Sequence, residues 1–161
     1  GGIVLIRSNA DLDVHRLHVP KGLYVAVIYP EVEVLTREAR SILSKQVNLD
    51  QLIRQSGNLA GFIVGLYNTD FDLIRRSLED VVIEPQRARL IPHFYEVKEA
   101  ALRAGALGCS ISGAGPSIFA LCDNTLTAEA AGKQMQAVFD QSRIKNHLFL
   151  SAINQEGAVK C

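Results

Sequence analysis

The sequence predicts an α+β domain, in which helices cover one face of an antiparallel sheet. Two observations lead to this prediction. Short apolar runs alternate with segments whose apolar residues recur every three or four positions, so both strands and amphipathic helices are expected. The chain has 161 residues, of which 48% are hydrophobic and 21% charged, and this suffices for one buried core but not for two full domains.

The first two strands are expected near the beginning of the chain. The run from Ile3 to Ile6 is short and β-branched and leads into a polar loop over residues 7–13, so we expect it to lack strand partners in this chain. The run from Leu23 to Tyr29 is continuously apolar and stops at Pro30, which has no N–H to donate. Such a run is typical of a strand that is buried on both faces.

Helical spacing of apolar residues recurs in five later segments, and it predicts helices over residues 35–43, 49–67, 71–81, 94–104 and 128–139. Thr69 lies three residues before Asp72, as in a capping box, and we expect it to begin the third helix, which then ends at Pro85. Gly105 is expected to end the fourth helix, and Thr127 is the candidate N-cap of the fifth.

Two close-set apolar runs, over residues 107–111 and 118–122, are expected to form a hairpin around the short connection of residues 112–117. Residues 147–153 give the last strand. The order of elements is then β, a cluster of helices, α, β, β, α, β. This order predicts the ferredoxin-like split βαβ arrangement, with extra helices inserted in the first crossover.

Composition argues against several classes of partner. The 17 Lys and Arg residues balance the 17 Asp and Glu residues, so no overall field attracts nucleic acid or anionic lipid. No apolar run approaches the roughly 20 residues that span a bilayer. The cysteines at 109, 122 and 161 are widely spaced and odd in number, which favours reduced thiols over disulfides or a metal site. We therefore expect a cytoplasmic protein with no metal ligands of its own and no nucleic-acid or membrane partner.

The densest chemical signal is the segment from Gly108 to Ser117, with three glycines and three serines in ten positions. Glycine allows close approach of the backbone, and successive N–H groups in a turn can form an anion-binding concavity. The segment is neither a Walker A loop, because no Lys follows the glycines, nor a G-x-G-x-x-G fingerprint, because Ile118 stands in the last position. The local pattern fits an ordinary hairpin turn equally well.

Four stretches together resemble the homoserine kinase family, which belongs to the GHMP kinase superfamily. The run Ile111 to Ser117, followed by residues 119–123, resembles the family's C-terminal motif. Thr36 to Arg40 resembles the family's segment after its buried strand, and Leu59 to Phe62 resembles a helix that follows it. The most family-specific match is Glu84 to Pro92, which has the form Glu-Pro-x-Arg-x-x-Leu-Ile-Pro.

This resemblance implies that the intact protein transfers the γ-phosphoryl of ATP, with Mg²⁺, to the side-chain hydroxyl of L-homoserine on the route to threonine. A guanidinium suits the substrate carboxylate because its planar fork engages both oxygens. The resemblance assigns this task to Arg40 and Arg87, and Thr36, one helical turn before Arg40, could add a hydrogen bond. It also implies a Gly-rich active-site loop made of Ser112, Gly113, Ala114, Gly115 and Ser117.

Other residues are assigned no role in the reaction. The plain alternative for Arg40 is a solvated helix charge, and Arg89 does not match the family position, so it is expected at the surface. His93 and His147 are expected to be structural or exposed rather than general bases. Cys109 is expected to be a small buried residue beside the turn. No catalytic residue is assigned.

The resemblance covers the chain from about residue 22 onward. Residues 1–21 are therefore expected to be a remnant strand and linker of a missing N-terminal ATP-binding lobe, and residues 22–161 the C-terminal domain. Nothing in the sequence resembles the family's phosphate loop. The chain alone is then expected to be inactive and to bind no ATP or Mg²⁺. The surface that faces the missing lobe should be unusually apolar, and the parent is expected to be a homodimer.

Two other functions remain open from the sequence. A non-catalytic ferredoxin-like module that binds amino acids or supports assembly would need no ATP-binding lobe, and a fold alone does not fix a function. A related kinase for mevalonate-type or sugar substrates would share the Gly-rich hairpin. Such a kinase would leave the Arg40 and Arg87 matches without a reason.

Overall fold

The structure is a computed structural model that describes residues 1–157, so Cys161 lies outside the described residues. The elements in chain order are β1 (Val4–Ser8), β2 (Asp13–Arg16), β3 (Tyr24–Pro30), α1 (Thr36–Ser41), α2 (Leu49–Asn68), α3 (Phe71–Ser77), α4 (Glu84–Arg87), a 3₁₀ turn (Ala88–Leu90), α5 (Phe94–Arg103), β4 (Gly108–Ile111), β5 (Ile118–Cys122), α6 (Thr125–Gln141) and β6 (Asn146–Ala152). Among these residues, no helix is long and apolar enough to cross a membrane.

Four strands form the main sheet, in the order β4-β5-β3-β6, and every neighbouring pair is antiparallel. Val27 at the centre of β3 lies opposite Phe119 of β5 on one side and Phe149 of β6 on the other. This is the strand order of the split βαβ arrangement, and the predicted fold class is confirmed.

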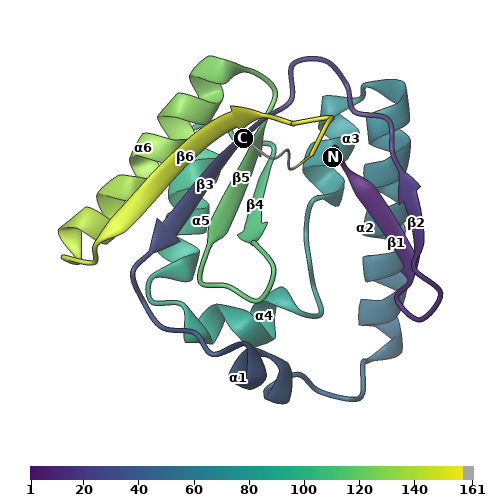
Figure 1. Cartoon of the computed structure of the whole chain (residues 1–161), viewed down its shortest axis with the longest axis horizontal. Helices are drawn as coiled ribbons and strands as arrows, with labels where there is room; N and C mark the ends of the chain where they lie inside the picture. The colour runs from purple at the N-terminus through teal and green to yellow at the C-terminus, as the bar shows by residue number, and fades with distance from the viewer. Residues whose placement is uncertain (158–161) are drawn as a thin grey trace.

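Helices α5 and α6 cover one face of the sheet, and α2 and α3 lie to the side of the sheet beyond β4 (Figure 1). On one face, Ala26, Ile28 and Ala120 pack in a buried core with residues of α5 and α6, among them Phe94 and Phe139. Because side chains alternate along a strand, the neighbouring Leu121 of β5 points to the opposite face. There it packs in a second, smaller core that includes Leu23, Leu66, Ile74 and Leu107. The helices that cover the sheet thus lie on one face, as predicted, and α2 and α3 contact the other face only through this smaller core.

The prediction of an unpaired first strand was wrong, because β1 pairs with β2 in a separate antiparallel hairpin. The partner strand falls in and just after the stretch that we predicted as a polar loop. The strand β2 has one apolar residue, Val14, and its other residues are Asp13, His15 and Arg16. Asp13 forms ion pairs with Arg7 and His15 on the exposed side of the hairpin. Because these contacts are polar, no apolar run in the sequence indicates the strand.

The third helix is shorter than predicted and begins at a different cap. Asp70, and not Thr69, is the N-cap of α3, and its side chain accepts a hydrogen bond from the N–H of Leu73 at 2.9 Å. Thr69 instead ends α2 in the left-handed conformation, with a φ of 56°. The helix ends at Ser77, well before Pro85, and Pro85 lies in the first turn of α4.

The early end of α3 has a local cause at Asp80. Its carboxylate accepts hydrogen bonds from the N–H groups of Val82, Ile83 and Glu84 at 2.8–3.1 Å. An Asp side chain that binds nearby backbone donors competes with continued helix and favours a turn. A similar local contact sets the beginning of α6, where Asn124, and not Thr127, is the N-cap.

Candidate functional site

Three segments that are far apart in the sequence lie together at one end of the molecule. They are α1, α4 and the loop between β4 and β5, which Figure 1 shows at the lower end of the sheet. These segments carry every residue that the sequence analysis predicted for the substrate and the Gly-rich loop. The end of the domain that they form is therefore the candidate site.

Arg87 joins the three segments. Its Nε donates to the carbonyl oxygen of Ala39 in α1 at 3.1 Å, and its Nη1 donates to the carbonyl oxygen of Gly113 in the loop at 2.9 Å. The neighbouring Gln86 adds a second link, because its Oε1 accepts from the N–H of Ser44, just after α1, at 2.6 Å. The guanidinium of Arg87 thus stands at the junction of the site.

The charge of Arg87 is available to an anion. The residue is partly buried, and it forms no ion pair with any Asp or Glu in the part of the chain that the structure describes. A guanidinium has five N–H donors, and the two bonds to carbonyl oxygens leave three for a ligand. A partly buried cation without a counter-ion favours binding of a carboxylate or a phosphate group.

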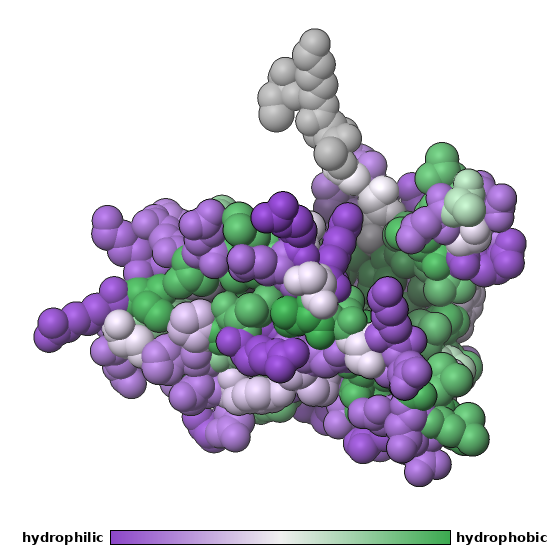
Figure 2. Space-filling view, turned by 90° about the horizontal axis from the view of Figure 1, so that it is seen from below, coloured by the Kyte–Doolittle hydropathy of each residue, from purple (hydrophilic) through white to green (hydrophobic). Residues whose placement is uncertain are grey.

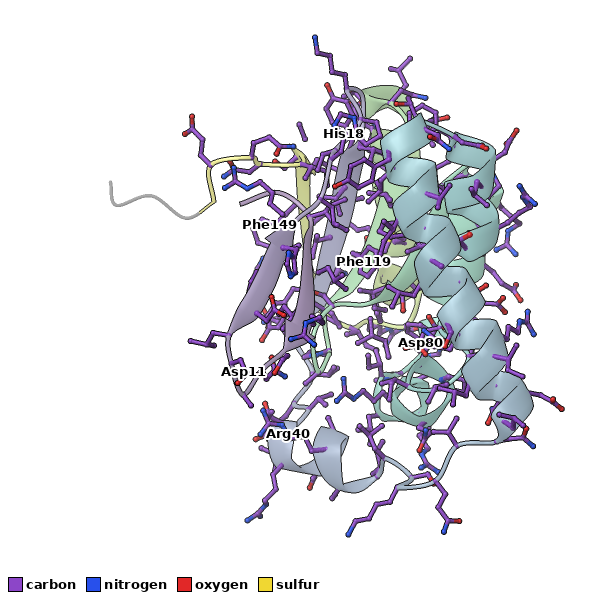
Figure 3. All side chains as sticks on the ribbon, turned by 90° about the vertical axis from the view of Figure 1, so that its right-hand side faces the viewer. Asp11, His18, Arg40, Asp80, Phe119 and Phe149 are labelled. Atoms are coloured by element: carbon purple, nitrogen blue, oxygen red, sulfur yellow. The ribbon has the colours of Figure 1, made fainter. Side chains whose placement is uncertain are left out.

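Thr36 and Arg40 both lie in α1, four residues apart, so helical geometry places them on one face. Both residues are exposed, and among residues 1–157 neither side chain has a hydrogen bond or an ion pair. Figure 3 shows Arg40 at the same end of the molecule as the loop. The residue before Arg40, Ala39, accepts a hydrogen bond from Arg87 through its carbonyl oxygen. A contact of Thr36 or Arg40 with the substrate stays a prediction.

The Gly-rich loop is closed by its own backbone. The N–H of Ser112 donates to the carbonyl of Ser117 at 2.8 Å, and the N–H of Gly115 donates to the carbonyl of Ser112 at 3.1 Å. Gly113 has a φ of 62° and Gly115 a φ of 88°, a region that residues with a Cβ rarely adopt. Within the described residues, the N–H groups of Gly113 and Ala114 have no partner. The predicted hairpin is confirmed, and it offers two adjacent donors.

The sequence analysis missed a buried polar cluster next to the site. Glu84 is only 4% exposed, its Oε1 forms an ion pair with Lys98 of α5, and its Oε2 accepts from the hydroxyl of Ser110 in β4 at 2.6 Å. Glu84 begins the Glu84 to Pro92 stretch, so the motif that contains it could be identified in the sequence. The sequence did not indicate that its side chain is buried, because an isolated Glu before a Pro is most simply the acidic first turn of a helix.

The two buried thiols, Cys109 and Cys122, are not activated in the folded chain. Burial raises the pKa of Cys109 from its ordinary value of 9.0 to about 12, and the nearby charges of Lys98 and Glu84 have smaller effects. Burial likewise raises the pKa of Cys122 to about 11. Both stay protonated near neutral pH, so neither is an activated nucleophile. Cys109 is a small buried residue beside the turn, as predicted.

The residues that the sequence analysis set aside lie at the surface. Arg89 is exposed, and its Nε donates to the carbonyl of Gln86. His93 is exposed at the start of α5. His147 is exposed on β6, where its Nε2 lies 2.9 Å from a carboxylate oxygen of Glu31. Among residues 1–157, no three His, Cys, Asp or Glu side chains gather in a group that could hold a metal ion.

One hollow among the described residues lies beside the candidate site, not at it. It measures about 190 Å³ and lies between α2 and the open face of the sheet, where Phe62, Leu78, Ser110 and Phe119 line it. Figure 3 shows Phe119 between the sheet and α2. Thr36, Arg40 and Arg87 do not line this hollow. This hollow therefore does not indicate the place that the charge of Arg87 indicates, and the charge is the more specific chemical signal.

The split βαβ sheet, the Gly-rich hairpin and the partly buried Arg87 beside it together define the C-terminal domain of a small-molecule kinase. The family model "GHMP kinases C terminal" matches residues 62–141, which include Arg87 and the hairpin but not α1. The chain contains a GHMP kinase C-terminal domain.

Individual relatives narrow the comparison to homoserine kinases. The chain is 49% identical over 160 residues to a homoserine kinase of Chlorobium phaeovibrioides, covering 98% of this chain and 50% of that protein. A crystal structure of homoserine kinase from Cytophaga hutchinsonii is similar over 96% of this chain and 49% of the other, with 50% identity and a TM-score of 0.94. A mevalonate kinase of L. major shares the fold at 16% identity and a TM-score of 0.69. The chain spans about half the length of the curated relatives it matches.

Proposed function

We propose that this chain is the homoserine-binding half of a homoserine kinase, an enzyme that transfers the γ-phosphoryl of ATP to the side-chain hydroxyl of L-homoserine and gives O-phospho-L-homoserine. The observation that carries the proposal is the partly buried guanidinium of Arg87, which links α1 to the Gly-rich loop and has no carboxylate partner among residues 1–157. The similarity to homoserine kinases at 49–50% identity supports this substrate.

The carboxylate of homoserine is the group that Arg87 suits best. The three free N–H donors of the guanidinium include a pair on Nη2, which can meet one or both oxygens of a carboxylate in a planar arrangement. Arg40 adds a second positive charge on the neighbouring helix, and the hydroxyl of Thr36 adds a donor or acceptor on the same face. The substrate's reacting hydroxyl would then be oriented from its amino-acid end.

ATP and Mg²⁺ are proposed to be held mainly by the other half of the enzyme. When bound, ATP supplies the phosphoryl group and Mg²⁺ neutralises charge on its phosphates. What this chain offers to a phosphate is limited to the adjacent N–H groups of Gly113 and Ala114 and the positive charge of Arg87. These groups fit a supporting role at the edge of a phosphate site.

The other half of the enzyme is also the proposed partner of the exposed apolar surface. This surface includes Val4, Ile6, Leu12 and Val14 of the β1–β2 hairpin and Leu49, Leu52, Ile53, Leu59, Val64 and Tyr67 of α2. Figure 2 shows apolar side chains exposed along the side on which α2 lies. Exposed apolar side chains gathered on one side of a molecule mark an interaction site. The division into a linker over residues 1–21 and a domain over residues 22–161, the homodimer and the cytoplasmic location remain part of the proposal.

The test is made in the intact enzyme that contains this chain, with a coupled assay of ADP formation. Arg87→Ala should raise the Michaelis constant for homoserine by about 100-fold and leave that for ATP within about threefold, because the lost contact is to the substrate carboxylate. Arg89→Ala is the matched control, since it removes an exposed guanidinium two residues away. Equal effects of Arg87→Ala on both Michaelis constants would show that Arg87 does not contact the homoserine carboxylate.

The isolated chain provides the second test. Without the other half it should form no ADP at saturating ATP and homoserine, and robust turnover would contradict the proposed division of labour. A non-catalytic amino-acid-binding module would behave differently. It would bind homoserine tightly in titration calorimetry as the isolated chain, while no ADP formation would accompany binding in the longer protein.

A further inference from the structure

Glu84 is a buried carboxylate that the proposed substrate contacts do not use. Its side chain is 5% exposed and that of its ion-pair partner Lys98 is 17% exposed. Each carboxylate oxygen has a different partner, with Lys98 of α5 on Oε1 and Ser110 of β4 on Oε2. A buried charge is costly unless it is paired and hydrogen-bonded, so a carboxylate retained here needs a reason beyond packing.

The helix that carries Glu84 cannot hold its own position. α4 has only the four residues Glu84–Arg87, a single turn, and a single turn has no stability by itself in water. Its beginning is held by Asp80, whose carboxylate accepts from the N–H of Glu84 at 3.1 Å. The orientation of α4 must therefore be fixed by its contacts with the rest of the domain.

Two of those contacts form matched links to the Gly-rich hairpin. Glu84 binds Ser110 and Arg87 binds Gly113, so the two links are three positions apart on α4 and three positions apart on the hairpin. The first link is partly buried and lies on the strand, and the second is exposed and lies in the loop. The hydrogen bond between Glu84 and Ser110 holds the beginning of α4 against β4, and Arg87 lies about one helical turn further on.

We infer that Glu84 is a positioning residue for homoserine, which sets the guanidinium of Arg87 against the loop by binding Ser110 and Lys98. This inference rests on the proposed function, because Arg87 must contact the substrate for its position to matter. Glu84 itself touches neither the loop nor Arg87 through any hydrogen bond or ion pair in the described residues. Its effect on the substrate is transmitted through one turn of helix.

The test compares single and double variants in the intact enzyme. Glu84→Gln and Ser110→Ala should each raise the Michaelis constant for homoserine by about tenfold and leave that for ATP within about twofold. Ser110→Ala removes only a hydroxyl, so it keeps the test valid if Glu84→Gln does not fold. Glu99→Gln is the matched control, because it neutralises an exposed carboxylate of the same helix as Lys98 and should change neither constant.

The decisive comparison is made in the Arg87→Ala background. If Ser110 acts only by positioning Arg87, Ser110→Ala adds no further increase once the guanidinium is gone. An additive increase would mean that Ser110 contacts the substrate directly and would overturn the inference. So would an unchanged homoserine constant in both single variants, provided that Arg87→Ala alone still raises it. If Arg87→Ala alone has no effect, it is the proposed function that fails.

Discussion

The two arginines proposed for one substrate are held very differently. Arg87 is partly buried and bonded to the carbonyls of Ala39 and Gly113, while Arg40 is exposed on a helix of six residues and has no such bonds in the described part of the chain. A side chain that is already fixed loses little conformational freedom when a ligand binds. Arg87 therefore suits the role of a preorganised anchor, whereas Arg40 would have to become ordered with the substrate.

The largest expected effect on stability comes from breaking the ion pair between Glu84 and Lys98. Lys98→Ala should lower the free energy of unfolding by about 3–5 kcal/mol, because it leaves the buried carboxylate of Glu84 without its counter-ion. Arg103→Ala breaks the exposed pair with Glu99 on the same helix and should cost about 0.5 kcal/mol or less. Urea unfolding of the isolated chain measures both. Similar small losses for the two variants would show that Glu84 is not held as firmly as its burial indicates.

A smaller effect on stability is expected when the side chain of Arg87 is removed. Arg87→Ala should cost about 1–3 kcal/mol, since the carbonyls of Ala39 and Gly113 lose a charged donor. Arg40→Ala should change the free energy of unfolding by less than about 0.5 kcal/mol, because its side chain is exposed. The same urea titrations of the isolated chain measure this difference. Equal losses for the two variants would contradict the contrast between a fixed and a free arginine.

Much of the fold could be predicted from the sequence because its strands and helices have strong apolar periodicity. β3 is a continuous apolar run, and α2 and α5 keep one apolar stripe over several turns. The errors fall where side chains, rather than periodicity, decide. The strand β2 is polar and is recognised only by its pairing with β1, and the end of α3 depends on how the carboxylate of Asp80 binds the backbone.

The candidate site was predictable in its residues but not in its connections. The motif that contains Arg87 and the Gly-rich hairpin could both be identified, and the structure joins them through a hydrogen bond. The pairing of Glu84 with Lys98 and Ser110 spans 14 and 26 residues of sequence, and no local pattern indicates it. Tertiary packing brings these three groups together, so only the fold could reveal the link between α4 and the hairpin.

The smallest effect is expected on the buried side of the same hairpin, at Cys109. Its pKa is raised from 9.0 to about 12 by burial, so the folded protein keeps the thiol protonated at a pH where the unfolded chain ionises it. The unfolded state then binds fewer protons, and stability that is fully present below pH 9 is lost as the pH rises from 9 toward 12. Between pH 8 and pH 10 this loss should amount to about 1 kcal/mol for one such thiol.

Cys109→Ala isolates this contribution, although the substitution also leaves a small cavity in the core. The cavity lowers stability by a similar amount at every pH, whereas the ionisation acts only above pH 9. The stability difference between the original chain and Cys109→Ala should therefore shrink by about 1 kcal/mol from pH 8 to pH 10 in urea unfolding under reducing conditions. Parallel pH profiles would show that Cys109 reaches solvent in the folded state, and the interior beside Glu84 and Lys98 would then be less closed than its burial indicates.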